Sequence, residues 1–280
     1  MHPIYNYIKQ SLHGLYSDGE VSALSKWIAT DVLGLSTVDL YAGKDSKFQS
    51  EKVERLEYIL ERLKLYEPLQ YILGEAQFDG LSFRVSPAVL IPRPETAELV
   101  AWIAQDYSHH ANPHILDIGT GSGCIPVSLA RRLPCAKVSA WDISADALAV
   151  ARSNAQANGV EVDFSLVDVL GTAIPDARVD VLVSNPPYIT EMEKADMERN
   201  VTDWEPDIAL FVPDDNPLLF YRRIAELGLT LLNSGGALYF EINRAYGCDT
   251  VCMMEQLGYT SVCMRKDDFG NDRMVKGILK

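Results

Sequence analysis

The segment VLVSNPPYIT ends an apolar run in Asn185, two prolines and Tyr188. Neither Pro186 nor Pro187 has a backbone N–H, so the turn offers carbonyl acceptors without local donors. Pro186 also biases Asn185 toward an extended conformation. The Asn185 side-chain oxygen and the Pro186 carbonyl can then each accept one hydrogen from a planar –NH₂ group. Tyr188 adds an aromatic face for a flat substrate group.

A second candidate site is the glycine loop in LDIGTGSGC, where Gly119, Gly121 and Gly123 follow an apolar run. Glycines allow a tight turn and a close approach of a ligand to the main chain. The pattern G-x-G-x-G differs from the G-x-G-x-x-G of dinucleotide binders. Asp117 precedes the loop, and its negative charge disfavours a pyrophosphate ligand. The same carboxylate favours a ligand that carries an amino group and a sulfonium.

Two further carboxylates follow the next two predicted strands. Asp142 occupies the place where an acidic residue commonly binds ribose hydroxyls. Asp168 can accept from an adenine amino group, and Val169 can supply a backbone N–H and an apolar wall. Because ligands of open α/β sheets bind at the carboxyl ends of the strands, these residues predict a site for S-adenosylmethionine rather than NAD.

The two sites together predict methyl transfer to a weakly nucleophilic nitrogen. An amide or aryl amine nitrogen has a delocalised lone pair. Acceptors on both N–H bonds orient that nitrogen in line with a sulfonium methyl and stabilise the positive charge that develops on it. The predicted reaction is a direct displacement without a covalent enzyme intermediate, and it requires no dedicated general base.

The elements that must position these residues alternate from His114 onward. Seven strand patterns, with helix patterns between most of them, predict a mostly parallel, doubly wound, seven-stranded Rossmann-like sheet. The last two strand patterns have no helix between them, which predicts a terminal antiparallel hairpin. The region before the sheet is divided into a small helical bundle over residues 1–75 and a hairpin linker over 76–95. The methyltransferase domain is expected over 96–280.

Composition excludes several classes of protein. The net charge is −14, which disfavours direct nucleic-acid binding. No apolar run is long enough for a membrane span, and the first residues lack the pattern of a secretory signal. Five cysteines without a C-x-x-C pair predict no disulfide framework or zinc site and favour a reducing cytoplasm. We expect no bound metal, and we interpret His109, His110 and His114 as part of a solvated loop.

The chain resembles the release-factor glutamine methyltransferases over nearly its whole length. The resemblance rests on EPLQYILGEAQFDGLSFRVSPAVLIPRPETAELV, LDIGTGSGC, VSNPPYI, EPDIAL and DFGNDR. NPPY alone is weak, since amino-methyltransferases of adenine and guanine carry similar motifs, but IPRPET upstream of DIGTGSG is much more specific. The resemblance implies methylation of the side-chain amide of the glutamine in a Gly-Gly-Gln motif of peptide chain release factors.

The resemblance also implies the class I methyltransferase fold and a set of site residues, and it leaves two roles open. By position, cofactor contacts fall on the glycine loop with its Thr120 and Ser122, on Asp142, Val169 and Asn185, and substrate contacts on the Asn-Pro-Pro-Tyr turn. S-adenosylhomocysteine is the implied product. The helical region is either a substrate-docking domain or a structural appendage. Arg93 and Glu95 either line the substrate entrance or bridge the domains, or are surface charges of a proline-rich linker.

The sequence leaves three alternatives to methylation of a release factor. A methyltransferase for adenine N6 or guanine N2 of nucleic acid uses the same planar –NH₂ chemistry. A protein that merely binds S-adenosylmethionine without catalysis needs no acceptor turn, and the intact turn argues against it. An NAD-dependent oxidoreductase is the third, and it predicts binding of a nicotinamide cofactor.

Overall fold

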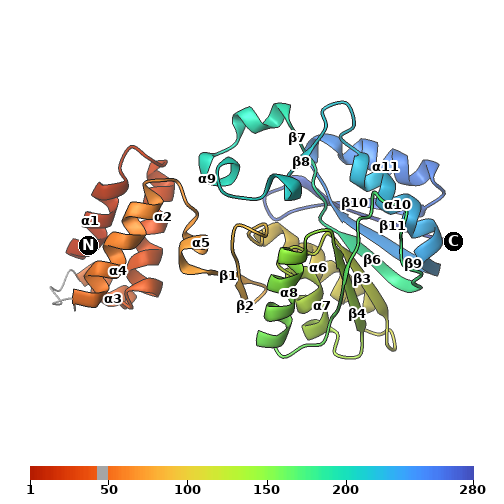
Figure 1. Ribbon diagram of the computed structural model, residues 1–280, viewed down its shortest axis with the longest axis horizontal. Coiled ribbons are helices and arrows are strands. Elements are labelled where there is room, and N and C mark those ends of the chain that lie inside the picture. Colours follow the sequence, from red (N-terminus) through yellow and green to blue (C-terminus); the bar gives the residue numbers. More distant parts are fainter. Residues whose placement is uncertain (43–49) are drawn as a thin grey trace. The chain divides into compact units, whose positions relative to one another are not determined.

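The computed structural model describes residues 1–42 and 50–280 of the chain (Figure 1). These residues form two compact units. The first contains Met1–Leu73, within its described part, together with Arg199–Trp204. The second contains Gly74–Glu198 and Glu205–Lys280. The hairpin that the sequence assigns to a linker therefore lies inside the second unit.

The first unit is a helical bundle around an aliphatic core. Ile8, Leu12, Ile28 and Leu60 are fully buried in this core. Ile8 and Leu12 are four residues apart and therefore share one face of a helix. Apolar faces of this kind are what a helical bundle buries. The helices are α1 (Pro3–Leu12), α2 (Asp18–Trp27), the π-helical turn η1 (Ile28–Val32), α3 (Thr37–Ala42), α4 (Ser50–Leu63) and α5 (Leu69–Leu73). None of the helices in the described residues is long and apolar enough to span a membrane.

The second unit begins with a short antiparallel hairpin of β1 (Glu75–Phe78) and β2 (Leu81–Arg84). Asp79 and Gly80 join the strands with φ angles of 52° and 75°. Two consecutive positive φ angles match the twist of a two-residue hairpin, and Asp-Gly is a preferred sequence for it.

A seven-stranded sheet forms the centre of the second unit, in the order β10-β11-β9-β6-β3-β4-β5. The strands from β9 to β5 are parallel, and β11 pairs antiparallel with both β9 and β10. This confirms the predicted fold class, including the terminal hairpin. The bounds are β3 (His114–Ile118), β4 (Lys137–Asp142), β5 (Asp163–Leu166), β6 (Val179–Ser184), β9 (Leu232–Glu241), β10 (Thr260–Lys266) and β11 (Asp272–Ile278).

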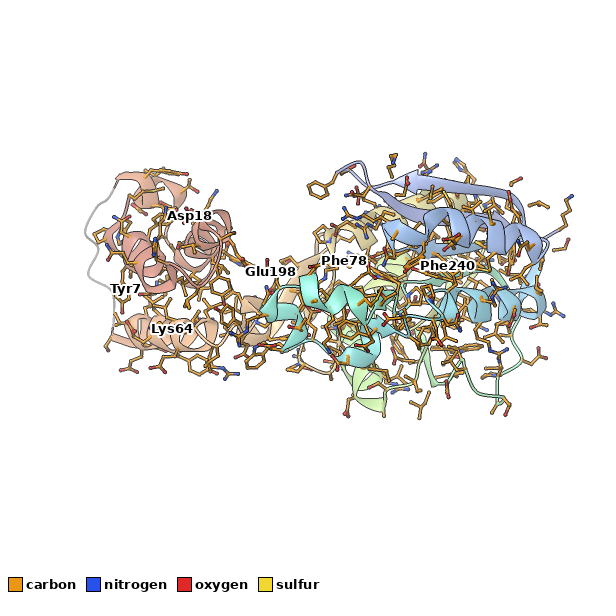
Figure 2. All side chains as sticks on the ribbon, turned by 90° about the horizontal axis from the view of Figure 1, so that it is seen from above. Tyr7, Asp18, Lys64, Phe78, Glu198 and Phe240 are labelled. Carbon is orange, nitrogen blue, oxygen red and sulfur yellow. The ribbon has the colours of Figure 1, made fainter. Side chains whose placement is uncertain are left out.

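Helices cover both faces of this sheet, as Figure 1 shows. In β6, Val181 and Val183 belong to the core cluster that includes α6 and α7, whereas Leu182 belongs to the cluster that includes α10 and α11. This period of two is the alternation of a strand that is buried on both faces. Phe78 and Phe240, labelled in Figure 2, lie one in each cluster. The helices are α6 (Pro94–Tyr107), α7 (Cys124–Arg132), α8 (Ala145–Ala157), α10 (Leu219–Leu231) and α11 (Gly247–Gln256).

The carboxyl ends of the parallel strands lie in register. Ile118 pairs with both Trp141 and Ser184, and Ser184 also pairs with Phe240. The chain runs from β3 outward to β4 and β5, and then returns to β6 on the other side of β3. The β3–β6 junction is therefore the topological switch point, where open α/β sheets bind their ligands.

A long connection leaves the sheet after the Asn-Pro-Pro-Tyr turn. It starts and ends in a two-residue parallel pair of β7 (Ile189–Thr190) and β8 (Phe211–Val212). Between them lie η2 (Met192–Asp196), α9 (Arg199–Thr202) and η3 (Asp207–Ala209). Within the first unit, Trp204 Nε1 donates to the Leu65 carbonyl at 3.1 Å, and Arg199 lies over the Tyr66 ring.

Candidate active site

A pocket of about 260 Å³ opens at the carboxyl ends of β3, β4 and β6. Every residue that lines it belongs to the second unit. Its lining includes ten of the predicted site residues, and the exceptions are Asp117, Gly123 and Tyr188. The ten are Gly119, Thr120, Gly121, Ser122, Asp142, Asp168, Val169, Asn185, Pro186 and Pro187.

The three glycines of the loop have different physical roles. Gly119 and Gly121 have φ angles of 75° and 52°, and a Cβ atom would meet no atom within 4 Å at either position. Gly123 also has a positive φ, and there a Cβ atom would lie 3.0 Å from the Ala151 Cβ atom. Gly123 therefore allows α7 to pack against α8, while the first two glycines shape the backbone that lines the pocket.

Asp117 is fully buried beneath this loop. Among the described residues, neither oxygen of its carboxyl group has a hydrogen-bond partner, and the Thr120 hydroxyl is likewise unpartnered. Burial, reinforced by the charge of Asp142, raises the pKa of Asp117 to about 7. An unpaired buried carboxylate is costly, so this position suits a ligand that brings a positive charge or hydrogen-bond donors.

Asp142, the last residue of β4, is held by the backbone on two sides. Its Oδ2 accepts from the Gly121 N–H at 2.8 Å, and its Oδ1 accepts from the Ser144 N–H at 2.9 Å. A carboxylate has about four acceptor sites, so both oxygens can still accept from ligand hydroxyl groups. The bond to Gly121 also links this carboxylate to the glycine loop.

Asp168 and Val169 lie in the turn after β5. Asp168 is exposed, and its Oδ1 accepts from the Leu170 N–H at 2.9 Å. Arg223 of α10 donates to the carbonyls of Val169 and Gly171 at 2.8 and 3.0 Å, which ties this turn to α10. Val169 contributes an apolar wall to the pocket, and Ile143 contributes another.

The Asn-Pro-Pro-Tyr turn leaves two acceptors without protein donors. The Asn185 Nδ2 atom lies 3.3 Å from Thr96 Oγ1 and donates to it. Within residues 1–42 and 50–280, no hydrogen bond uses the Asn185 Oδ1 atom or the Pro186 carbonyl. Both residues line the pocket. The turn thus places two acceptors beside the glycine loop, as the sequence predicts for a planar –NH₂ group.

Tyr188 has a different surrounding from its three neighbours in the turn. Its hydroxyl donates to Glu241 Oε1 at 3.2 Å, and its backbone N–H donates to the Leu210 carbonyl. Burial, with the charge of Glu241, raises the pKa of Tyr188 far above its ordinary value. The ring packs against the core cluster that includes α10, so the Tyr188 hydroxyl anchors the turn to β9.

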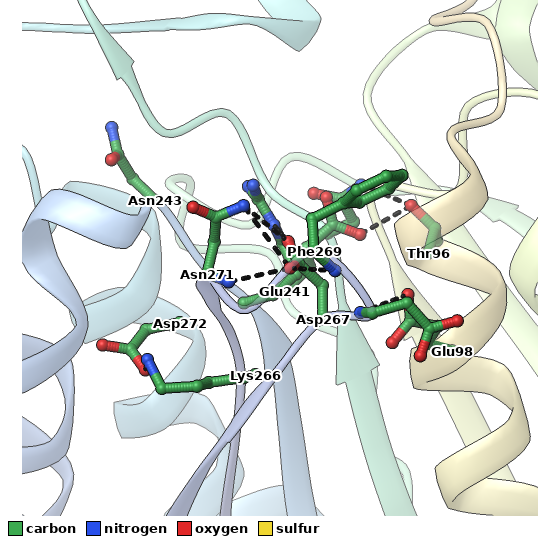
Figure 3. A network of polar contacts seen from close by, with 12 residues as sticks. Thr96, Glu98, Glu241, Asn243, Lys266, Asp267, Phe269, Asn271 and Asp272 are labelled. Carbon is green, nitrogen blue, oxygen red and sulfur yellow. Dashed lines mark hydrogen bonds and ion pairs between the residues drawn. The ribbon is translucent and has the colours of Figure 1, made fainter.

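Thr96 and Glu241 are polar residues of this region that the sequence reasoning missed. Both are buried, and the Thr96 hydroxyl donates to Glu241 Oε2 at 2.6 Å (Figure 3). Burial raises the pKa of Glu241. The signal in the sequence was a carboxylate that interrupts the apolar run GGALYFEI at its carboxyl end, in the place that Asp117 has in LDIG.

Arg93 forms an ion pair with a buried carboxylate and is not a free surface charge. Its Nη2 atom lies 2.6 Å from Glu205 Oε1, and Glu205 Oε2 accepts from the Ile91 N–H at 3.2 Å. The pair joins the segments IPRPET and EPDIAL within the second unit. Burial raises the pKa of Glu205, and the Arg93 guanidinium opposes that shift. Arg93 also lines the pocket.

No group of three His, Cys, Asp or Glu residues in the part of the chain that the structure describes is arranged to hold a metal ion. His109, His110 and His114 are exposed, and the His110 ring lies against Tyr107.

Known proteins match both units of the chain. Residues 4–74 match the family described as PrmC N-terminal domain, and residues 96–202 match the family described as Methyltransferase small domain. A release factor glutamine methyltransferase of Bacteroides thetaiotaomicron is 53% identical over 98% of this chain and 99% of its own length. The chain belongs to the release factor glutamine methyltransferase family. A Flavobacterium psychrophilum member of that family is 44% identical over 95% of each chain.

Solved structures of more distant proteins share the fold. A methyltransferase from Pyrococcus furiosus has a TM-score of 0.52 and 19% identity, and the match covers 82% of this chain and 98% of that one. A T. thermophilus 16S rRNA N2 G1207 methyltransferase has a TM-score of 0.53 and 17% identity, with 74% and 50% coverage. At these identities the likeness shows the fold and not the substrate. The substrate of a family member must come from closer relatives and from its own site.

Proposed function

We propose that this protein transfers the methyl group of S-adenosylmethionine to the side-chain amide nitrogen of the glutamine in the Gly-Gly-Gln motif of peptide chain release factors. The observation that carries the proposal is the pair of acceptors at the pocket wall, Asn185 Oδ1 and the Pro186 carbonyl, which no described protein donor uses. The 53% identity to a release factor glutamine methyltransferase over nearly the whole chain supports the substrate.

The residues that line the pocket, and Asp117 beneath its glycine loop, fit S-adenosylmethionine. The orphaned carboxylate of Asp117 and the orphaned hydroxyl of Thr120 suit the positive and hydrogen-donating end of this cofactor. Asp142 is assigned to the ribose hydroxyls, and Asp168 with Val169 to the adenine. When bound, the cofactor supplies a methyl group on a positively charged sulfur.

Asn185 and Pro186 act on the substrate nitrogen. Their two oxygens accept both hydrogens of the glutamine –NH₂ group, which fixes the plane of the amide and points its nitrogen at the methyl group. They also stabilise the positive charge that builds on nitrogen as the N–C bond forms and the S–C bond breaks. The surplus proton of the methylated nitrogen leaves to water, so the protein needs no base of its own for this step.

The decisive experiment is mass spectrometry of a release factor incubated with the protein and S-adenosylmethionine. We expect one added methyl group, on the glutamine of the Gly-Gly-Gln motif, and none when that glutamine is replaced by alanine. A parallel incubation with RNA and with DNA tests methylation of adenine or guanine. Methyl groups found only in nucleic acid would refute the proposal.

Replacement of Asn185 by alanine tests the acceptor turn. We expect kcat to fall by about 10²–10³-fold, because one charge-stabilising group of the transition state is lost. Binding of S-adenosylhomocysteine, measured by calorimetry, should change much less. Asn158→Ala is the control, because Asn158 bonds only to the Ser82 and Asn154 carbonyls outside the pocket. An unchanged kcat for Asn185→Ala would show that the turn does not act on the nitrogen.

A further inference from the structure

Glu241 ends β9 and is almost fully buried, with only 1% of its surface exposed. Its two carboxyl oxygens accept from different hydroxyl groups. Thr96, on the first turn of α6, donates to Oε2 at 2.6 Å, and Tyr188 donates to Oε1 at 3.2 Å. Figure 3 shows Thr96 turned from its helix toward Glu241. A hydrogen-bond chain therefore runs from Glu241 through Thr96 to the Asn185 amide.

The direction of each bond in this chain follows from counting protons. A threonine hydroxyl has one proton to donate, and an ionised carboxylate can only accept. The Thr96 proton is therefore committed to Glu241, and the Thr96 oxygen can only accept from its other neighbour. That neighbour is the Asn185 amide, whose Nδ2 atom lies 3.3 Å away. The –NH₂ end of Asn185 must then face Thr96, and its oxygen must face the other way.

We infer that Glu241 and Thr96 are positioning residues that set the Asn185 side-chain amide with its oxygen toward the substrate nitrogen. This inference rests on the proposed function. The reversed amide would present an –NH₂ group to the –NH₂ group of the substrate, and it would replace a needed acceptor by a competing donor. The two residues thus act on the substrate nitrogen through Asn185, although Thr96 also lines the pocket.

The inference requires Glu241 to be ionised, and several elements set its charge. Burial, with the charge of Glu95 of α6, raises the pKa of Glu241, while the hydroxyl groups of Thr96 and Tyr188 and the charge of Arg273 of β11 favour the ionised form. Tyr221 of α10 and Cys124 of α7 also face Glu241. A protonated Glu241 can donate to Thr96, which frees the Thr96 proton for the Asn185 oxygen and turns the amide around. The methylation rate should therefore fall as the pH is lowered and one proton binds to Glu241.

Thr96→Val removes the hydroxyl group and keeps the shape of the side chain. We expect kcat for methylation of a release factor to fall by about 10–100-fold, as is usual when a supporting hydrogen bond is lost, with little change in the affinity for S-adenosylhomocysteine. Thr96→Ser should regain most of the lost rate. Thr250→Val is the matched control, because Thr250 of α11 is also buried but donates to the carbonyl of Tyr246, the residue before this helix. The control should keep the wild-type kcat.

A double mutant separates positioning from a general structural effect. In the Asn185→Ala background, Thr96→Val should cause no further loss of rate, because the amide that Thr96 positions is gone. A structural defect would lower the rate by the same factor in both backgrounds. The inference would be overturned if Thr96→Val lowered the rate by the same factor in the wild-type and Asn185→Ala backgrounds. It would also be overturned if Thr96→Ser were as slow as Thr96→Val.

A spectroscopic measurement keeps this inference separate from the proposed function. If the wild-type protein methylated no release factor, the function would fail, and the orientation of Asn185 would still be measurable. The side-chain ¹⁵NH₂ signals of Asn185 in the full-length protein are identified by their absence in Asn185→Ala. We expect these signals to shift in Thr96→Val and to move with pH in a single step in the wild type. Signals that stay unchanged in Thr96→Val would overturn the inference.

Discussion

Two buried carboxyl groups near the carboxyl ends of β3 and β9, the strands on either side of β6, have opposite surroundings. Asp117 of β3 has no hydrogen-bond partner among the described residues, whereas Glu241 of β9 has two hydroxyl donors and lies near Arg273. A group without protein partners is free for a ligand, and a group whose partners are all protein orients its neighbours. The same functional group thus has two uses, set by what surrounds each carboxyl group.

Asp117→Asn should stabilise the free protein at high pH. The folded pKa of Asp117, about 7, lies above the ordinary value of about 3.9. The folded state therefore holds its proton more tightly than the unfolded state, and the free energy of unfolding falls as pH rises between these two values. The loss is complete above about pH 7. We expect Asp117→Asn to gain about 1–3 kcal/mol at pH 8 and little at pH 4, measured by urea denaturation.

The same variant should bind S-adenosylmethionine at least about 10-fold more weakly at pH 8, because the amide cannot pair with a positive charge. Calorimetry measures this affinity. Asp163→Asn is the control, since Asp163 is exposed at the start of β5. A stability gain that is equal at pH 4 and pH 8 would contradict the assignment of this effect to ionisation.

The turns between strands and helices determine the shape of the site. The glycine loop leads from β3 into α7, the Asp168 turn is held by Arg223 of α10, and the Asn-Pro-Pro-Tyr turn is held by Tyr188. In each case a hydrogen bond to a side chain of a strand or helix fixes the turn: Asp142 of β4 accepts from the Gly121 N–H, and Glu241 of β9 accepts from the Tyr188 hydroxyl. The site residues therefore lie on loops, while the elements around them supply the precision.

Gly123→Ala should destabilise the second unit by about 2–4 kcal/mol, through a positive φ and a contact of 3.0 Å with the Ala151 Cβ atom. Gly119→Ala has a positive φ without such a contact and should cost about 1 kcal/mol. Urea denaturation measures both. Ala151→Gly should recover part of the loss in Gly123→Ala. If the two alanine variants were equally stable, the contact with α8 would have no energetic weight.

At the scale of the whole molecule, the chain passes between the two units three times. The first passage is at Leu73–Gly74, and the other two flank Arg199–Trp204. Although it lies in the connection between two strands of the second unit, the segment Arg199–Trp204 belongs to the first unit. Trp204 attaches it there through its bond to the Leu65 carbonyl and its ring near Arg62.

Trp204→Ala should lower the stability of the first unit by about 1–2 kcal/mol, since it removes one hydrogen bond and one cation–π contact. Hydrogen exchange followed by mass spectrometry should show faster exchange around Leu65 and no change in the strands of the central sheet. Trp204→Phe keeps an aromatic ring but not the N–H, so its exchange rate around Leu65 should lie between those of the wild type and Trp204→Ala. Equal acceleration in both units would mean that the segment does not belong to the first unit alone.

Much of the fold was predictable because local patterns carry it. Alternating strand and helix patterns predicted the mostly parallel sheet, and the two strand patterns without a helix between them predicted its terminal antiparallel pair. The sequence placed the hairpin in a linker, and the structure places it in the second unit. That difference arises because membership of a unit depends on packing, such as the bond from the Arg84 N–H to Asn154, which joins residues far apart in the chain.

The sequence by itself determined the chemical character of the site. Prolines without donors, an amide oxygen and strand-end carboxylates are local properties, and parallel strands must bring their ends to one edge. Only the tertiary structure decided which of these groups face the pocket and which support them. Tyr188 turned inward, Gly123 served helix packing, and Thr96 joined Glu241 to Asn185 across 145 and 89 positions of the chain. Such bonds depend on distance in space, and a single sequence records only distance along the chain.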